Sequence, residues 1–470
     1  MKTLTIFLSV ILAQSVFASA PKYVFLFIGD GMSTPQRTMA EEFSRKAGFG
    51  DIAMNHFPVK SATRTHSANS VITDSAASAT AIACGVKTNN GMLGVDPATN
   101  HLESIAYVAQ KAGKKIGIIT TVTIVHATPA GFYAHRESRG MSYRIGLDLV
   151  SSGFDYFAGG GMYDKYNDTA DAQYRGNVFD LAKNAGYIVN ICDVPAWKAL
   201  KPGSKSWNVF SKTAMNYSID ANKKEPTVAE MLSKGIELLD GPNGFFIMCE
   251  GGKIDYAGHA NDAATNLRDL IALDKAVRVA LKFQEEHPED TLIVTTGDHE
   301  TGGLSMGFAG VGSSFRVELL ANQTMSVDVF ADKIKRLIKK SCGKIAFEDV
   351  VGELEKAFGF VFPGPNTNKS DPMLLTPEEV AKLKDSFAKD VAFSNADGKE
   401  TGDYTAQRKF VFAQTARKIL AAHAGVAWST SSHTALPTLT TAKGRSAEAF
   451  ANLTDNTEIS KVFKKLYRGE

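Results

Sequence analysis

The chain has 470 residues, of which 44% are hydrophobic and 22% are charged, with 40 Gly and 15 Pro. These are ordinary globular proportions, and they exclude a disordered, collagenous or coiled-coil protein. Lys and Arg number 52 against 50 Asp and Glu, which gives a formal net charge of +2. The chain therefore lacks the excess of basic residues that is typical of proteins with a dedicated nucleic-acid or anionic-membrane partner.

The first twenty residues have the pattern of a secretory signal peptide. Lys2 is followed by an apolar run from Leu4 to about Leu12, and the segment ends in small residues. A buried N-terminal strand is the alternative interpretation. No later segment reaches the ~20 consecutive apolar residues that a membrane helix needs. We therefore expect residues 1–20 to be removed and residues 21–470 to form a periplasmic or secreted catalytic domain without a membrane span.

The four cysteines are spread widely along the chain and form no CxxC pair, so their spacing does not indicate a thiolate metal site. Cys84 and Cys249 lie in apolar runs and are interpreted as buried thiols. Cys192 and Cys342 are the candidates for a disulfide.

Four short apolar runs are predicted to be strands buried on both faces, because they are continuous rather than alternating. These runs are Tyr23 to Ile28, Ile116 to Val122, Phe245 to Met248 and Thr291 to Thr295. Helical patterns, at about 74–83 and 263–286, lie among them. This alternation predicts an α/β fold, a three-layer α/β/α sandwich around a central, mainly parallel sheet.

The residue pattern changes between about residues 341 and 427, where no strand-like apolar runs are predicted. Three helical patterns, at 347–358, 376–391 and 404–423, are separated there by loop-like segments. A Ser- and Thr-rich, β-like character resumes afterwards. We therefore expect a helical insertion within the catalytic domain.

Polar residues with metal-ligand chemistry follow three of the predicted strands. In α/β sheets, ligands bind beyond the carboxyl ends of the strands, and carboxylate with imidazole suits a catalytic zinc site. An Asp in a tight turn is the alternative interpretation of any one of these positions alone. The residues are Asp30, Glu250, Asp255, His259, Asp298 and His299.

A run of small residues, Asp74-Ser75-Ala76-Ala77-Ser78, is predicted to begin a helix. A serine hydroxyl at that position lies near free backbone N–H groups, where an anion is favoured. A simple Ser or Asp N-cap is the alternative interpretation. Metal ions can lower the pKa of such a hydroxyl, so no Ser-His-Asp order is required.

Three more residues are ambiguous without context. The Thr128 hydroxyl is a hard oxygen ligand suited to Mg²⁺. The Arg139 guanidinium offers a planar fork for two phosphate oxygens, although a surface salt bridge is the alternative. His433 lies late in the chain, in Ser431-Ser432-His433-Thr434.

Taken together, these segments resemble the alkaline phosphatase family from about Tyr23 to near the C-terminus. The most specific piece is VITDSAASATAIACGVKTNNGMLGVD, followed by IGDGM, HATPA, EGGKID, DHETGG and LTDNTE. The resemblance implies an α/β sandwich that holds two zinc ions and one magnesium. It also implies hydrolysis of phosphate monoesters through a phosphoserine, small-molecule substrates, and a homodimer.

The resemblance also implies a role for each matching residue. Ser75 corresponds to the nucleophile, Arg139 to the phosphate clamp, and Asp74 to the residue that orients that arginine. The first zinc would be held by Asp255, His259 and His433, and the second by Asp30, Asp298 and His299. Magnesium would be held by Asp30, Thr128 and Glu250.

Two positions beside the metals depart from the pattern of the best-known bacterial members. His126 stands where those have an Asp near magnesium, which bears on the identity of the third metal. Tyr256 stands where they have a Lys, which removes a cation near the phosphate.

Two other functions remain as alternatives. One is a phosphodiesterase on the same metal scaffold, against which Arg139, Thr128 and Glu250 weigh because they serve a monoester dianion. The other is a secreted phosphate- or metal-binding protein without turnover, against which Ser75 weighs. A sulfatase is disfavoured because no Cys-x-Pro-x-Arg stretch is present.

Overall fold

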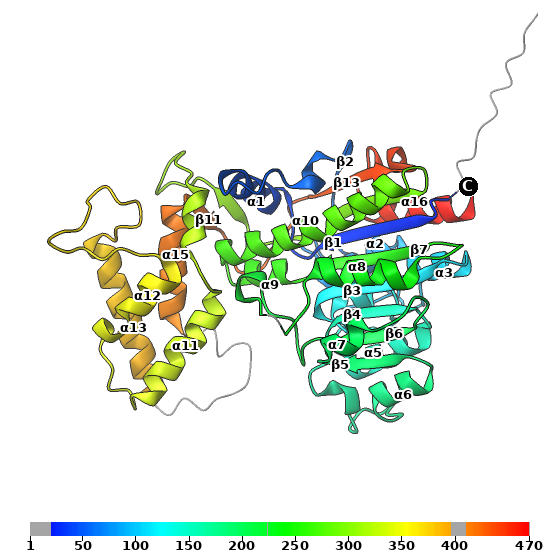
Figure 1. The fold of residues 1–470 in the computed structure, drawn as a ribbon, viewed down its shortest axis with the longest axis horizontal. Coiled ribbons are helices and arrows are strands. Elements are labelled where there is room, and N and C mark those ends of the chain that lie inside the picture. Colours follow the sequence, from blue (N-terminus) through cyan, green and yellow to red (C-terminus); the bar gives the residue numbers. More distant parts are fainter. Residues whose placement is uncertain (1–19, 223, 396–409, 470) are drawn as a thin grey trace, which may run out of the picture.

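The computed structural model describes residues 20–222, 224–395 and 410–469. The predicted signal peptide therefore lies, but for its last residue, outside the described residues. A sheet of nine strands forms the centre, in the order β2-β13-β8-β1-β7-β3-β4-β6-β5 (Figure 1). Helices cover both of its faces. The predicted α/β sandwich around a mainly parallel sheet is confirmed.

All four predicted strands are present and lie side by side in the sheet. The pairs β1·β7, β1·β8, β3·β7, β3·β4, β4·β6 and β5·β6 are parallel, whereas β13 runs antiparallel to both β8 and β2. The strands are β1 (Tyr23–Gly29), β2 (Val59–Thr63), β3 (Lys115–Thr123), β4 (Tyr156–Gly160), β5 (Ile188–Ile191), β6 (Ser206–Val209), β7 (Phe245–Gly251), β8 (Thr291–Gly297) and β13 (Thr438–Gly444).

The strand β1 shows why the apolar runs are continuous. Successive side chains of a strand point to opposite faces. Phe25 and Phe27 accordingly join one hydrophobic core, and Leu26 and Ile28 join the other. Every residue of β1 is buried. The sheet therefore divides two separate cores, one beneath each helical layer.

Helices on the first face pack over the core that contains Phe25 and Phe27. The long helix α10 begins where the Asp262 carboxylate accepts a hydrogen bond from the Thr265 N–H at 3.1 Å, and it covers β1, β7 and β8. The helices on this face are α1 (Thr34–Lys46), α7 (Val194–Lys198), α8 (Val228–Leu239) and α10 (Ala263–Glu286).

Helices on the second face cover the core that contains Leu26 and Ile28. The helix α2 is capped by Asp74, and ends at Gly85, whose φ of 78° is left-handed. The helices of this layer are α2 (Ser75–Cys84), α3 (Ile105–Lys111), α4 (Ala127–Ala130), α5 (Ser142–Ser152), α6 (Val178–Asn184) and α16 (Thr457–Arg468).

Several short helices and strands lie near the carboxyl ends of the central strands. The helix α9 (Lys253–His259) follows β7 almost directly, and two small antiparallel sheets pair β9 (Glu300–Thr301) with β12 (His433–Thr434) and β10 (Leu304–Met306) with β11 (Val426–Trp428). The 3-10 helices are η1 (Ala53–His56), η2 (Lys165–Asn167), η3 (Ser218–Asp220), η4 (Val317–Asn322), η5 (Phe347–Val350) and η6 (Ala447–Phe450).

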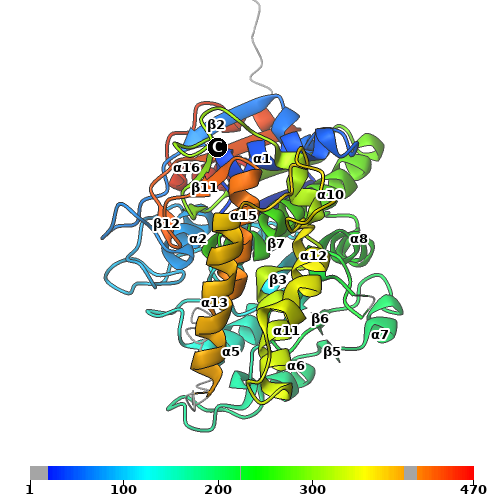
Figure 2. The same ribbon diagram turned by 90° about the vertical axis from the view of Figure 1, so that its left-hand side faces the viewer.

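A group of four helices projects from this end of the sandwich (Figures 1 and 2). We call it the helical unit. It comprises α11 (Val327–Lys340), α12 (Val351–Phe358), α13 (Pro377–Asn395) and α15 (Val411–His423). The helices predicted at 347–358, 376–391 and 404–423 correspond to α12, α13 and α15, although residues 404–409 lie outside the described part of the chain. The preceding α11 packs against α13 and α15 as well.

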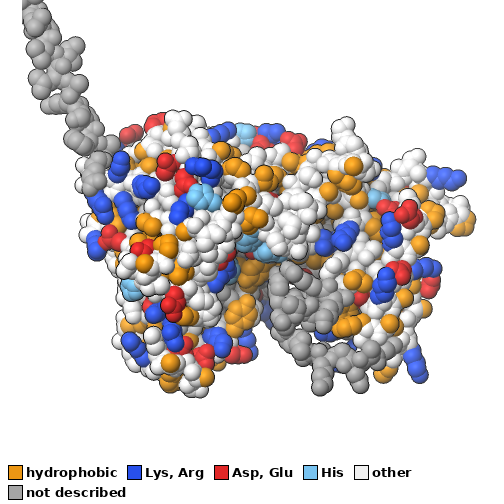
Figure 3. Space-filling model, turned by 180° about the vertical axis from the view of Figure 1, so that it is seen from behind, with side chains coloured by type: hydrophobic (Ala, Val, Ile, Leu, Met, Phe, Trp, Pro, Cys, Tyr) orange, Lys and Arg blue, Asp and Glu red, His pale blue; other side chains and the backbone are white. Residues whose placement is uncertain are grey.

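Three further features concern the whole molecule: its cysteines, the character of its helices and its surface charge. All four cysteines are free, so Cys192 and Cys342 form no disulfide in this structure. None of the described helices combines the length and the apolar character that a membrane crossing requires. Figure 3 shows basic and acidic side chains interspersed over the face it presents, as the near balance of charge implies.

Gly297, the last residue of β8, gives a test of how tightly the strand ends are packed. A Cβ at this position would lie 1.9 Å from the carbonyl oxygen of Met32, in the turn that follows β1. We expect Gly297→Ala to destabilise the protein by about 1–3 kcal/mol, because the backbone must shift to accept the methyl group. Urea unfolding measures this change.

The matched control is Gly352→Ala, in α12. A Cβ at Gly352 meets nothing within 4 Å. Alanine is the better helix former, so this variant should equal or exceed the unchanged chain in stability. Equal stability of the Gly297→Ala protein and the unchanged chain would contradict the predicted close packing.

Candidate active site

The register of the sheet brings the strand ends together. Gly29 of β1 pairs with Gly251 of β7 and with Gly297 of β8. Residues at or just beyond the end of one strand therefore lie beside the corresponding residues of the neighbouring strands. Thr120 of β3 likewise pairs with Glu250 of β7. Four adjacent parallel strands, β8-β1-β7-β3, thus present their polar side chains at one edge.

Three residues that directly follow β1 and β8 form one compact group. The His299 Nε2 atom lies 3.3 Å from Asp30 Oδ1 and 3.3 Å from Asp298 Oδ2, and all three side chains are fully buried. Their ligand atoms lie within 4.8 Å of one another. We call Asp30, Asp298 and His299 the second ligand group. The hydroxyl of Ser75, at the first position of α2, lies 3.1 Å from His299 Nε2.

Another group joins α9 to β12. Asp255 and His259 lie one turn apart on α9, with Asp255 Oδ2 3.3 Å from His259 Nε2. His433 reaches the same point because it pairs with Thr301 of β9, and its Nε2 lies 3.5 Å from Asp255 Oδ1. The two imidazole Nε2 atoms are 3.2 Å apart. We call Asp255, His259 and His433 the first ligand group.

Backbone carbonyls fix the orientation of both imidazoles in this group. His259 Nδ1 lies 2.7 Å from the Ser431 carbonyl, and His433 Nδ1 lies 2.9 Å from the Thr73 carbonyl. A ring nitrogen that faces a carbonyl carries the proton. Nε2 is therefore the nitrogen that can bind a metal ion. Although burial alone would lower it, the charge and hydrogen bonds of Asp255 raise the pKa of both His259 and His433, so each ring must release its Nε2 proton when a cation binds.

The third ligand group comprises Asp30, His126 and Glu250. His126 Nδ1 lies 3.8 Å from Asp30 Oδ2, and the Thr128 hydroxyl donates to the same oxygen at 3.4 Å. The Thr120 hydroxyl donates to Glu250 Oε2 at 2.5 Å. Asp30 thus belongs to two groups at once, because its two oxygens point to different sides.

Burial and mutual repulsion shift the pKa values of the carboxyl groups. Burial, followed by the charges of Asp298, Asp255 and Glu250, holds the pKa of Asp30 well above its usual range. Burial raises the pKa of Glu250 to about 8 and that of Asp298 to about 7. For Asp255, burial is outweighed by the charges and hydrogen bonds of His259 and His433, which hold its pKa well below the usual range.

The pKa values of the histidines in the second and third groups are lowered rather than raised. Burial, with the charge of Arg139, lowers the pKa of His126 to about 3. Burial and the charge of His433 hold the pKa of His299 well below its usual range. Both imidazoles are therefore neutral, which is the form that binds a metal ion.

Several buried ligand atoms have no hydrogen-bond partner among the described residues. They are Asp30 Oδ1, Asp298 Oδ2, Glu250 Oε1 and His126 Nδ1. Buried polar atoms without partners are costly, and carboxylates that face one another are costlier still. Divalent cations satisfy both requirements at once. The three groups therefore fit metal ions by geometry and charge.

Arg139 and Asp74 complete the edge of the site. Arg139 donates from Nη1 to Asp74 Oδ2 at 3.0 Å, and its Nη2 lies 3.0 Å from His126 Nε2. The other oxygen of Asp74 accepts from the Ala77 N–H at 3.0 Å and caps α2. One carboxylate therefore orients both the arginine and the helix end that carries Ser75. Tyr256 lies farther out, its ring edge-on to His126 with centroids 6.0 Å apart.

Two threonines in the site were not found by sequence reasoning. The Thr301 hydroxyl donates to Asp255 Oδ1 at 2.5 Å and lies 3.2 Å from His299 Nδ1, so it links the first and second ligand groups. Its position two residues after His299 could have pointed to it. Thr120, the donor to Glu250, lies inside an apolar strand, and no spacing in the sequence marks it.

Comparisons with known proteins agree with this geometry. A family model described as alkaline phosphatase matches residues 21–468. The chain belongs to the alkaline phosphatase family. This is a family of enzymes that hydrolyse phosphate monoesters with the help of metal ions.

Individual relatives support the same assignment. Alkaline phosphatase 3 of Bacillus subtilis is 28% identical over 95% of this chain and 89% of its own length. The repressible alkaline phosphatase of Saccharomyces cerevisiae is 31% identical over 60% of this chain, and the match spans 55% of that protein. The crystal structure of a cold-active alkaline phosphatase from Shewanella sp. superimposes with a TM-score of 0.78 at 25% identity, covering 95% of this chain and 99% of that one.

The pKa shifts predict how metal removal changes stability. Glu250 and Asp298 have pKa values of about 8 and about 7 in the folded chain, against 4.5 and 3.8 when unperturbed. Between pH 6.5 and 8.5 the metal-free folded state therefore loses protons that the unfolded state has already released, so its stability falls as pH rises. Bound cations should abolish most of this loss, because they pair with the ionised carboxylates.

Melting temperatures of chelator-treated and metal-loaded protein across this pH range measure the effect. We expect the difference between the two to widen as pH rises. In the metal-free protein, Glu250→Gln should flatten the pH dependence because it removes one titrating carboxyl group. A metal-free protein that becomes more stable from pH 6.5 to 8.5 would contradict the assignment.

Proposed function

We propose that this chain hydrolyses phosphate monoesters of small alcohols through a covalent phosphoserine on Ser75. The observation that carries the proposal is the position of the Ser75 hydroxyl. It lies at the N-terminus of α2, 3.1 Å from His299 of the second ligand group, with Arg139 held nearby by Asp74. A hydroxyl placed beside cations and free N–H groups is suited to attack a phosphate dianion.

We further propose two zinc ions in the first and second ligand groups and one magnesium in the third. The mixture of imidazole and carboxylate ligands in the first two groups suits zinc at a catalytic site. Asp30, Thr128 and Glu250 supply the hard oxygen atoms that magnesium prefers. When bound, such ions lower the pKa of hydroxyl groups and of water and stabilise oxygen atoms that carry developing charge.

The side chains of the chain position the reaction. Ser75 Oγ supplies the attacking oxygen and forms the new bond to phosphorus while the ester oxygen leaves on the opposite side. The Arg139 fork, kept in place by Asp74, binds the non-bridging oxygens of the phosphoryl group. Thr301 keeps Asp255 and His299 in fixed orientations. A second in-line displacement, by water, releases inorganic phosphate and restores the Ser75 hydroxyl.

The geometry favours a monoesterase over a diesterase. Asp74 holds Arg139 beside the start of α2, and a diester has one non-bridging oxygen fewer than a monoester to accept hydrogen bonds from its guanidinium. A ratio of rates on matched aryl phosphate monoesters and diesters separates the two activities.

Two more proposals rest on the family resemblance and on the N-terminal sequence. We propose that the chain is exported to the periplasm or the medium after removal of a signal peptide, and that it works as a homodimer. N-terminal sequencing of the purified protein and its sedimentation at equilibrium test these two statements separately.

Replacement of Ser75 by Ala tests the covalent step. We expect kcat on an aryl phosphate to fall about a thousandfold or more, because the attacking oxygen is lost while binding of phosphate persists. Elemental analysis should show unchanged metal content. The control is Ser233→Ala, on the exposed side of α8, which should keep the activity of the unchanged chain. Full activity of Ser75→Ala would refute a phosphoserine.

Replacement of His126 by Asp tests the third metal. An added carboxylate beside Asp30 and Glu250 supplies a harder ligand than imidazole, so we expect the affinity for Mg²⁺ to rise about tenfold. Calorimetric titration of the zinc-loaded protein measures this change. The control is His101→Asp, since His101 is exposed, stacks on His135 and belongs to none of the candidate metal-binding groups among the described residues. An unchanged or weaker Mg²⁺ affinity of His126→Asp would contradict the assignment of the third group.

A further inference from the structure

A pocket of about 260 Å³ lies directly beside the first ligand group, between α9 and the helical unit. His259 and Ser431 line one side of it. Asp328 of α11, with Gln414 and Arg417 of α15, lines the other. A water molecule occupies ~30 Å³ in the liquid, so the pocket accommodates about eight or nine non-hydrogen atoms. This is the size of a small alcohol rather than of a polymer.

Arg417 is the cationic residue of this pocket. The residue is only 9% exposed. Nη1 donates to the Asn261 carbonyl at 3.0 Å, whereas the buried Nε has no hydrogen-bond partner among the described residues. Burial lowers the pKa of Arg417, but an arginine stays charged at any physiological pH. A buried guanidinium with an unused donor is suited to a planar anion.

The acidic residue of the pocket is already engaged. The Tyr217 hydroxyl donates to Asp328 Oδ2 at 3.3 Å. Lys253 also acts on the Asp328 carboxylate electrostatically. The negative charge of Asp328 is therefore partly compensated from the side of α9. The charges of Asp262 and Asp328 also act on Arg417, which is the cationic group that can attract an anion into the pocket.

The pocket lies on the side from which the alcohol departs. Ser75 attacks from beside the second ligand group, and an in-line displacement puts the leaving oxygen on the opposite side of phosphorus. The first ligand group lies there, and His259, a member of that group, forms a wall of the pocket. The alcohol portion of the substrate is thereby directed toward Arg417.

We propose that Arg417 is a specificity-determining residue that binds a carboxylate on the alcohol portion of the substrate. This inference rests on the proposed function and deepens it. The preferred substrates are then phosphate monoesters of small hydroxy acids, gripped at the phosphate by the metal groups and Arg139 and at the carboxylate by the helical unit. Neutral phosphate esters are hydrolysed as well, but without the second contact.

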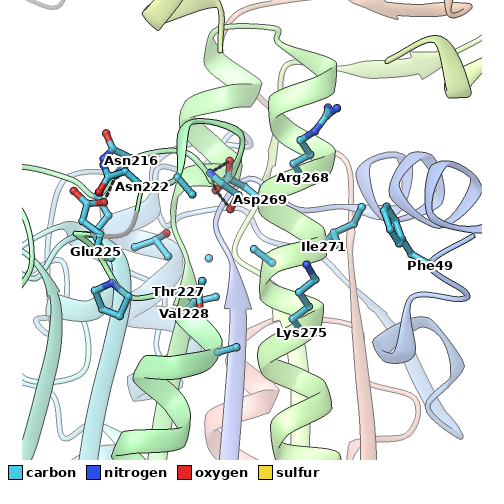
Figure 4. A pocket seen from close by; sticks show the side chains of 18 of the residues that line it. Phe49, Asn216, Asn222, Glu225, Thr227, Val228, Arg268, Asp269, Ile271 and Lys275 are labelled. Atoms are coloured by element: carbon cyan, nitrogen blue, oxygen red, sulfur yellow. Dashed lines mark hydrogen bonds between the residues drawn. The ribbon is translucent and has the colours of Figure 1, made fainter. Parts of the chain in front are cut away.

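Another cavity, of about 510 Å³, lies between α10 and the loop that leads into α8 (Figure 4). Its buried carboxylate, Asp269, already accepts hydrogen bonds from Ser218 N at 3.2 Å and Ser218 Oγ at 3.0 Å. No member of the three ligand groups lines this cavity. It therefore offers the substrate no metal group beside the reacting phosphoryl group.

A matched pair of substrates tests the proposal. In 3-phosphoglycerate the alcohol carries a carboxylate, whereas glycerol 1-phosphate has a hydroxymethyl group in its place. We expect the metal-loaded wild-type chain to show a kcat/KM for 3-phosphoglycerate at least about tenfold above that for glycerol 1-phosphate. In Arg417→Met this ratio should fall about 10- to 100-fold, since a charge-assisted hydrogen bond is lost. Arg417→Lys should be intermediate because it keeps the charge without the fork.

The ratio distinguishes recognition from a structural role. Loss of the bond to the Asn261 carbonyl could disturb the neighbouring His259, but that would slow both substrates equally and leave the ratio unchanged. The control is Arg316→Met, because Arg316 also donates to a carbonyl of the helical unit, that of His423 at 3.3 Å, outside the pocket. It should leave the ratio as in the wild type.

The outcomes separate this inference from the proposed function. Hydrolysis of both substrates with no preference in the wild type, or with the same preference in Arg417→Met, overturns the role of Arg417 alone. Absence of hydrolysis of any phosphate monoester by the metal-loaded wild type overturns the proposed function itself.

Discussion

Four carboxylates, those of Asp30, Glu250, Asp255 and Asp298, are buried at the carboxyl ends of neighbouring strands. Ionised together in a low-dielectric site they repel one another, and protonated they lose the ability to hold a cation. Divalent metal ions resolve this conflict, because each ion compensates the charge of several oxygens. The imidazoles of His126 and His299 are in the neutral form that such ions bind.

The sheet supplies the precision that such a cluster needs. Parallel strands in register carry Gly29, Gly251 and Gly297 side by side, and the lack of side chains at these positions lets the loops beyond them approach closely. A rigid edge of this kind fixes the separation of ligands that come from opposite ends of the chain. The positions of charged groups are then set by the core rather than by mobile loops, which is how electrostatic preorganisation is achieved.

In the proposed function, two parts of the fold would bind the two halves of a phosphate ester. The sheet edge and α2 would surround the phosphoryl group with metal ions, with Arg139 and with the N–H groups of a helix end. The helical unit approaches from the other side and contributes the pocket that contains Arg417. Such a division lets the chemistry at phosphorus stay constant while the recognition of the alcohol depends on a peripheral element, because only the first half is built into the core.

Much of this protein could be predicted from its sequence. Continuous apolar runs such as Tyr23 to Ile28 predict strands buried on both faces, since each face meets a core of its own. Carboxylates and histidines beside glycines at strand ends predict a metal-binding edge, and Asp74 before a run of small residues predicts the start of α2. These inferences depend on local patterns, and local patterns are what a linear sequence displays.

Other features exist only in three dimensions. The pairing of His433 with Thr301 joins residues 132 positions apart in chain numbering and completes the first ligand group. The hydroxyls of Thr120 and Thr301 become donors to Glu250 and Asp255 only through the register of strands and the turn at β9. Arg417 of α15 comes to lie beside Asn261, just after α9, and keeps a buried donor without a partner among the described residues. The sequence by itself determined which chemical groups the chain possesses and where its strands and helices begin. The tertiary structure decided which of those groups meet, because contacts between distant residues depend on packing and register, which leave no periodic signal in the chain.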